Sequence, residues 1–335
     1  MTQQLQHYVP RFLLRQFGSG KKDYVHIYDK QKGKTFKLSA GNKGMIPVAA
    51  ERGMYDFEFV GVPVSMEQGL SQQEAKAAQH IARIVKDGRL HPEDPMERGT
   101  LAVFLAVQMV RTRAVLEMNA DIFGRMKSWL DEQGVARDFF APDPHVGEGE
   151  NAQKALMARQ IANAHRDYAP VLLEKVWLLL RTDVRSPFLM GDHPIALFND
   201  VERPGRGNLG IAVEGIQIYF PLSPTLALAL WCLTIPEMLR KFVSMMADRS
   251  ESHPHEMGPH VQPWRDAIAT LEALNNSTPL LYRPENVEHF NSLQVAHAER
   301  FVFSSHSDFS FVEKMVGSEP LLRRGRRMSE MTGKF

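Results

Sequence analysis

The hydrophobic pattern in the first part of the chain changes from a period of two to a period near 3.6. Residues 24–38, YVHIYDKQKGKTFKL, contain two β-prone runs around a Lys/Gly turn, which predicts a hairpin. From Ser65 to Gly88 the apolar residues recur at helical spacing, and Gly88 is a suitable residue just beyond a helix end. The pattern therefore predicts a hairpin followed by a long helix.

Two further long helices are predicted in the middle of the chain. Residues 97–130 have a broad apolar face, and residues 152–181 continue the helical period. Pro170 lies inside the second segment, so we expect a kink or a break there. The Pro- and Gly-bearing residues 141–151 between the two helices predict a surface loop.

The pattern turns to strands after these helices. Residues 187–197 and 215–230 are apolar, rich in β-forming residues and punctuated by turns. Residues 264–277 and 286–299 are again helical in pattern. Residues 300–305, RFVFSS, predict a last strand.

Together these elements predict an α+β fold. We expect a mixed sheet, formed by the N-terminal hairpin and the C-terminal strands, that packs against a central bundle of long helices. No internal repeat or strong boundary is visible, so we predict a single domain over residues 1–315. Residues 316–335 are basic and are predicted to form a C-terminal tail.

Composition excludes several classes of protein. The 335 residues include 40 basic and 39 acidic side chains, and the net charge of +1 gives no general attraction to nucleic acid or membranes. The single cysteine, Cys232, excludes an internal disulfide and a cysteine-based zinc site. The sequence shows no signal peptide and no apolar run long enough to span a bilayer, so we expect a cytoplasmic protein without membrane contact.

The common catalytic signatures are absent from the sequence. It contains no GxxxxGK(S/T) phosphate loop, no GxGxxG after a strand, no HExxH helix and no GxSxG elbow. What remains is a set of charged or titratable residues placed inside apolar segments. These residues are His7, Arg11, Glu67, Glu74, Arg111 and Asp192.

Each of these residues also has a purely structural interpretation. Asp192 could cap its own turn, Glu67 could face the positive end of its helix, and Arg111 could pair with a glutamate in the core. Several such residues together favour one shared cluster, because an isolated buried charge is costly and needs a partner.

The chain resembles a bacterial and fungal family called domain of unknown function 4238. The opening segment HYVPRFLLRQF carries the most specific likeness, and it is followed by VHIYDK, MEQGLSQQE, VQMVRTRA, GDHP and FPLSP in the family's order. The likeness covers roughly residues 5–305. His193 stands where the family usually has Asn, and Gly191 where it usually has Ser. The resemblance implies a shared fold and candidate positions, and it implies that the N-terminal segment docks beside the turn at Asp192.

One hypothesis is a metal-assisted hydrolase that acts on phosphodiesters; a nuclease of a bacterial antiviral defence or toxin system is one form of it. Glu67, Glu74 and Asp192 would supply oxygen ligands for Mg²⁺ or Mn²⁺. His7 would act as a general base or a further ligand. Arg111, together with Arg11, would neutralise the charge that develops on the phosphoryl oxygens.

Two alternatives remain open from the sequence. In the first, no metal is used, and His7 and Asp192 form an acid–base pair. In the second, the chain is a non-enzymatic sensing or binding module, and the polar cluster is structural or holds a small anionic ligand through Arg11 and Arg111. Nucleic acid, a second copy of the chain or a protein encoded nearby are the partners that we consider.

Overall fold

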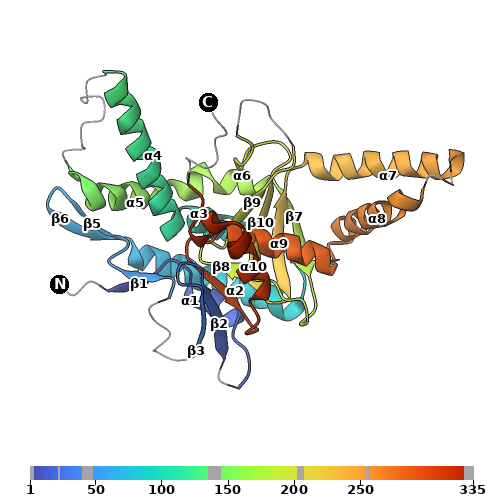
Figure 1. Cartoon of the computed structure of the whole chain (residues 1–335), viewed down its shortest axis with the longest axis horizontal. Helices are drawn as coiled ribbons and strands as arrows, with labels where there is room; N and C mark the ends of the chain where they lie inside the picture. Colours follow the sequence, from blue (N-terminus) through green and yellow to red (C-terminus); the bar gives the residue numbers. More distant parts are fainter. Residues whose placement is uncertain are drawn as a thin grey trace.

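The computed structural model shows two central sheets with helices around them (Figure 1). Helices α7 (Thr234–Ser252) and α8 (Val261–Asn276) pack against each other and extend away from the sheets. The residues that the structure describes are 4–21, 23–39, 48–134, 145–201, 207–253, 255 and 257–327.

One sheet joins the two ends of the sequence. Its strands lie in the order β3-β2-β13-β8, and every pairing is antiparallel. The predicted hairpin at residues 24–38 and the predicted last strand at residues 300–305 therefore lie side by side. The strands are β2 (Tyr24–Asp29), β3 (Lys34–Ser39), β8 (Met190–Gly191) and β13 (Phe301–Ser304).

The second sheet has the order β12-β7-β11-β10-β9 and is mixed. β12 runs parallel to β7, and the other neighbours are antiparallel. β10 and β11 form the predicted strand region at residues 215–230. The strands are β7 (Val176–Arg181), β9 (Ala196–Phe198), β10 (Gln217–Ser223), β11 (Leu226–Trp231) and β12 (Leu280–Leu281).

Both faces of this second sheet are covered. Alternate residues of β7 point to different cores: Leu179 joins one hydrophobic cluster, whereas Leu178 and Leu180 join another. β11, LALALW, divides in the same way and is buried along its whole length. A strand buried on both faces needs apolar residues at every position, which explains its continuous apolar run.

The helices in the middle of the chain fill the core that the two sheets share. The α+β prediction is confirmed. Two short strand pairs, β1–β4 and β5–β6, complete the N-terminal half. Their bounds are β1 (Leu5–His7), β4 (Ala50–Arg52), β5 (Asp56–Phe59) and β6 (Val62–Ser65). Helices that belong to or border this core are α1 (Arg11–Gln16), α2 (Glu67–Asp87), α3 (Pro95–Val110), α4 (Arg113–Glu132), α5 (Gly149–Asp167) and α6 (Ala169–Leu173).

The single helix predicted at residues 97–130 is in fact two helices. α3 and α4 meet at a bend of 50°. Thr112 is extended at the bend, with φ −91° and ψ 161°, and the Tyr55 hydroxyl donates to the Arg111 carbonyl at 2.9 Å. A tertiary hydrogen bond thus replaces a helical one at this point, which the local apolar pattern does not encode.

The helix predicted at residues 152–181 ends early. α5 stops at Asp167, and Pro170 lies in the first turn of the short helix α6, so the predicted break at this proline is confirmed. From Val176 onward the chain is the strand β7, because it pairs with β11 along its full length. The sequence VWLLLR suits a doubly buried strand as well as a buried helix.

The C-terminal region packs back on the first sheet. α9 (Pro284–His297), α10 (Ser310–Ser318) and the 3₁₀ turn η4 (Pro320–Arg323) follow the second sheet in the chain. Leu322 belongs to the hydrophobic cluster on the outer face of β2 and β13. The division into a domain at residues 1–315 and a tail at residues 316–335 stays a prediction.

Within the described residues, no single helix combines the length and the apolar composition needed to cross a membrane. The bent pair α3–α4 meets those two criteria when the helices are taken together.

Candidate functional site

The N-terminal motif, residues 5–17, is part of the folded body. β1 pairs with β4, and the Tyr8 amide donates to the Ala49 carbonyl at 2.9 Å. The buried side chain of Gln6 accepts the Tyr55 amide through its Oε1 at 2.7 Å. These bonds explain why this segment is apolar and aromatic, because it is part of the core.

Arg111 fixes this motif from inside the protein. Its side chain is 2% exposed, and its Nη2 donates to the His7 carbonyl at 2.6 Å. Its Nε donates to the Tyr55 hydroxyl at 3.3 Å. Nη2 also pairs with Glu74 Oε1 at 2.7 Å. One buried guanidinium therefore connects the motif, the β4–β5 turn and α2.

Two carboxylates on α2 lie beside this guanidinium. Glu67 and Glu74 are seven residues apart and share one helix face. The Glu74 side chain is 25% exposed, and Glu67 is half-buried. Burial raises the pKa of Glu67, the negative charges of Glu74 and Asp56 raise it further, and Arg111 lowers it. The pair is thus crowded with negative charge that Arg111 balances in part.

Asp192 directly follows β8, and its carboxylate contacts the turn between α9 and β13. It is 1% exposed, and its carboxylate accepts the amides of Glu299 at 2.6 Å and Arg300 at 3.0 Å. Burial raises the pKa of Asp192 to about 6, although backbone hydrogen bonds and the positive charge of Lys30 lower it. These contacts are those of a residue that fixes a turn. Its predicted catalytic and metal-binding roles stay predictions.

Lys30 is a completely buried cation near this turn. Its Nζ donates to the carbonyls of Val295 at 2.7 Å and Ala298 at 2.6 Å, which lie at the end of α9. Burial lowers the pKa of Lys30 to about 8, although Asp192 and Glu299 raise it. A lysine in this position supplies donors to helix-terminal carbonyls that lack an intrahelical partner.

The glycine and histidine of the GDHP turn also have clear surroundings. A Cβ on Gly191 would lie 2.7 Å from the Gln294 carbonyl, so a larger residue would force the backbone to move. His193 Nδ1 lies 2.6 Å from Thr112 Oγ1, and its ring stacks on His297 with centroids 6.4 Å apart. Burial lowers the pKa of His193 to about 4 and that of His297 to about 3, so both rings are neutral at pH 7.

The group around Arg111 and the group around Asp192 are neighbours. Arg111 is followed directly by Thr112, which contacts His193, the residue after Asp192. The pKa of Tyr8 reflects both groups: burial raises it well above the usual value, and Asp192 of one group and Tyr55 of the other raise it further.

The structure therefore brings part of the predicted set together. His7, Glu74 and Arg111 are in direct contact, with the His7 contact made by its backbone carbonyl, and Glu67 lies beside them. Arg11 begins α1 and is half-buried, and its Nε has no hydrogen-bond partner among the residues that the structure describes. The chemical roles predicted for these residues stay predictions.

Three further participants were not predicted: Tyr55, Lys30 and Thr112. Tyr55 lies in a run of alternating aromatic residues that is typical of a core strand, and this pattern does not show where its hydroxyl points. Lys30 ends the family-like VHIYDK segment, and Thr112 lies inside VQMVRTRA, so both motifs offered a signal.

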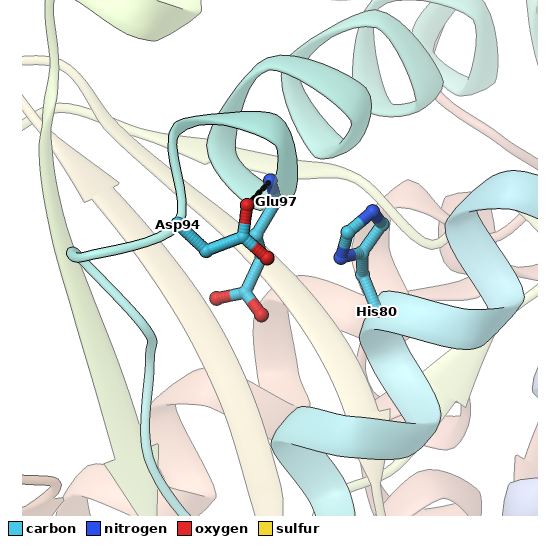
Figure 2. A group of neighbouring side chains, drawn as sticks. All are labelled: His80, Asp94 and Glu97. Carbon is cyan, nitrogen blue, oxygen red and sulfur yellow. Dashed lines mark hydrogen bonds between the residues drawn. The ribbon is translucent and has the colours of Figure 1, made fainter.

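A different group has the spacing of metal ligands. In the described part of the chain, His80, Asp94 and Glu97 have ligand atoms that all lie within 4.8 Å of one another. Figure 2 shows the His80 ring on α2 facing the two carboxylates at the start of α3. This group does not include Glu67, Glu74 or Asp192.

A family model described as protein of unknown function (DUF4238) matches residues 5–308. No curated protein and no solved structure matches the chain. The match spans every residue of the two neighbouring groups around Arg111 and Asp192 and supplies no activity for them.

Proposed function

The chain belongs to the DUF4238 family of proteins of unknown function, and we propose that it is a hydrolase that cleaves phosphodiesters with the help of a divalent cation. One observation carries the proposal: Glu67 and Glu74 lie two turns apart on one face of α2 and feel each other's charge, and the buried Arg111 is paired with Glu74. A hydrolase of this type needs hard oxygen ligands for its cation and a fixed positive charge for the phosphoryl group.

The electrostatics of the pair favour a cation. The charge of Glu74 raises the pKa of Glu67, which means that the two carboxylates repel each other. Mg²⁺ or Mn²⁺ between them would relieve this repulsion and offer a Lewis acid to the substrate. In this proposal Arg111 orients Glu74, and His7 serves as the base or as a further ligand.

The proposal extends to the source of the phosphodiester, which we take to be nucleic acid in a cytoplasmic setting. A net charge of +1 does not suit a broad duplex-binding surface. A short or single-stranded substrate that reaches one local site fits this charge better. A nuclease with these properties would suit a bacterial defence or toxin system.

We expect purified protein to cleave DNA or RNA, single- or double-stranded, in Mg²⁺ or Mn²⁺ and not in EDTA. Glu67→Gln and Glu74→Gln should each lower the cleavage rate by more than about 10-fold, because each removes a ligand charge. Glu272→Gln, on the exposed face of α8, is the matched control and should cleave at the wild-type rate. Cleavage that persists in both glutamine variants would exclude this site.

A second function is favoured by a specific observation. Arg111 and Asp192 are almost fully buried, and their polar atoms are engaged by protein groups. Such saturation suits a structural network inside a sensing or binding module. If no nucleic acid is cleaved and His7→Ala melts at a lower temperature that Mg²⁺ and Mn²⁺ do not change, the binding module is the better description.

A further inference from the structure

Helix α2 carries a second polar group nearer its C-terminal end, on a different face from Glu67 and Glu74. His80 lies on this face, and the chain returns to it through the loop before α3. Asp94 is the N-cap of α3 and accepts the amides of Met96 and Glu97 through Oδ1. The cap fixes one carboxylate oxygen and leaves Oδ2 directed away from the helix.

His80, Asp94 and Glu97 offer one nitrogen and two oxygen ligands. All three ligand atoms lie within 4.8 Å of one another, and in Figure 2 the imidazole faces the carboxylates. The ring nitrogens of His80 make no hydrogen bond to any residue that the structure describes, so one of them is available as a ligand. Imidazole with carboxylates is a ligand set that zinc accepts.

The side chain of Arg83 already neutralises the charge of the two carboxylates. Arg83 Nη2 lies 2.6 Å from Asp94 Oδ2 and 2.5 Å from Glu97 Oε2. The Arg83 side chain is 38% exposed, whereas that of Glu97 is 4% exposed. The guanidinium can therefore move into solvent, and the buried carboxylate that it leaves behind then needs another positive charge.

The buried carboxylate is also held in place from its other side. His91 Nδ1 lies 2.8 Å from Glu97 Oε2, and the His91 amide donates to Oε1 at 2.9 Å. His91 Nε2 in turn lies 3.1 Å from Asp87 Oδ2. This chain of contacts resembles the outer shell of protein metal sites, where histidine and carboxylate partners orient a ligand.

We propose that His80, Asp94 and Glu97 bind a zinc ion in exchange for the Arg83 guanidinium. After the exchange both carboxylates still have a positive partner, now the zinc ion, and the imidazole becomes its third ligand. Because Arg83 and His80 are three residues apart on one face of α2, release of the arginine opens the side from which the ion reaches the histidine. The site is independent of the proposed hydrolase.

The proposal is tested by calorimetric titration of Zn²⁺ into the full-length, EDTA-treated and desalted protein. We expect one site that His80→Ala weakens by more than about 10-fold. His165→Ala, a histidine exposed on α5, is the matched control and should leave the affinity unchanged. Arg83→Gln should tighten binding, because it removes the competing cation while the ligands remain.

Two results would overturn the proposal: wild-type protein that binds no zinc, or a His80→Ala protein, folded by circular dichroism, that binds zinc with wild-type affinity. A weaker site in Arg83→Gln would overturn the exchange, because a competitor cannot strengthen binding. Glu67→Gln and Glu74→Gln should leave zinc binding unchanged, so failure of the hydrolase proposal is distinguishable from failure of this one.

Discussion

Arg111 illustrates how one residue can determine the position of a whole motif. Its guanidinium reaches a backbone carbonyl of the N-terminal motif, a tyrosine hydroxyl and a carboxylate, while its own carbonyl accepts the same hydroxyl. None of these groups lies near it in sequence. The charge is buried, so its partners are required for stability whatever the site does chemically.

Arg111→Met should lower the free energy of unfolding by about 3 kcal/mol, because buried acceptors then lack a donor. Methionine keeps most of the apolar volume, so a new cavity does not add to this loss. Urea denaturation measures the change. Arg113→Met is the control: that side chain is 35% exposed and pairs with Glu51 and Glu117 near the surface, so a loss below about 1 kcal/mol is expected. Equal losses in the two variants would contradict the role that we assign to Arg111.

The sequence identifies several of these residues, and a glutamate as one partner of Arg111, but not the backbone groups that they contact. Arg111 and Asp192 stand out because each is polar inside an apolar segment. That reasoning detects burial, yet it contains no information on which carbonyl or amide lies opposite. The contact between Arg111 and the His7 carbonyl depends on how β1 docks, and the three-dimensional fold alone determines this.

At the scale of elements, the segment after α10 is hydrogen-bonded to the turn between α9 and β13. Arg327 makes two hydrogen bonds of 2.9 Å to the carboxylate of Glu299, and both residues are buried. The Gly325 amide donates to the same carboxylate at 3.1 Å. Glu299 is also the residue whose amide Asp192 accepts, so this segment supports the turn directly.

Replacement of Arg327 by Met should lower the free energy of unfolding by about 3 kcal/mol, because Glu299 then remains buried without its cation. Chemical denaturation of the full chain provides the measurement. The double variant Glu299→Gln with Arg327→Met should recover part of the loss, since it removes the unpaired charge. Arg323→Met, an exposed arginine of η4, should be close to wild type. An Arg327→Met protein as stable as that control would show that the pair contributes nothing.

Elements with a local signal were predicted well, and elements defined by distant partners were not. The hairpin at residues 24–38 has its own turn, and the helix predicted from Ser65 to Gly88 is α2, which is followed by Gly88 with φ +64°. The break at Thr112 and the strand from Val176 arise from contacts with Tyr55 and β11. The hydrophobic period and the composition of a segment do not depend on its distant partners, so the sequence pattern could not reveal these contacts.

At the scale of the molecule, buried titratable groups link stability to pH. The pKa of His193 is lowered to about 4 and that of His297 to about 3, from an ordinary value of 6.5. Their contribution to the free energy of unfolding is present above pH 6.5. It is lost as the pH falls, because the unfolded chain then binds more protons than the folded chain. Asp192 acts oppositely: its pKa rises from 3.8 to about 6, so its contribution is lost as the pH rises.

Between pH 7 and pH 5 the stability lost through the two histidines exceeds the stability gained through Asp192. The free energy of unfolding should therefore fall by about 2 kcal/mol over this interval. Urea midpoints across the range measure it. His193→Asn, which installs the residue that the family usually has, should remove roughly half of the histidine contribution. A wild-type stability that rises towards pH 5 would contradict the assignment of both histidines as buried and neutral.

The first sheet has a consequence for the order of events during synthesis. β2 pairs with β13, and Asp29 of β2 pairs with Arg300, 271 residues later in the chain. The N-terminal hairpin is therefore synthesised long before its central neighbour. Until β13 has been made, one edge of β2 has no partner, and unpaired edges promote aggregation. A nascent chain stalled before residue 300 should therefore depend on chaperones, whereas one stalled well beyond β13 should not.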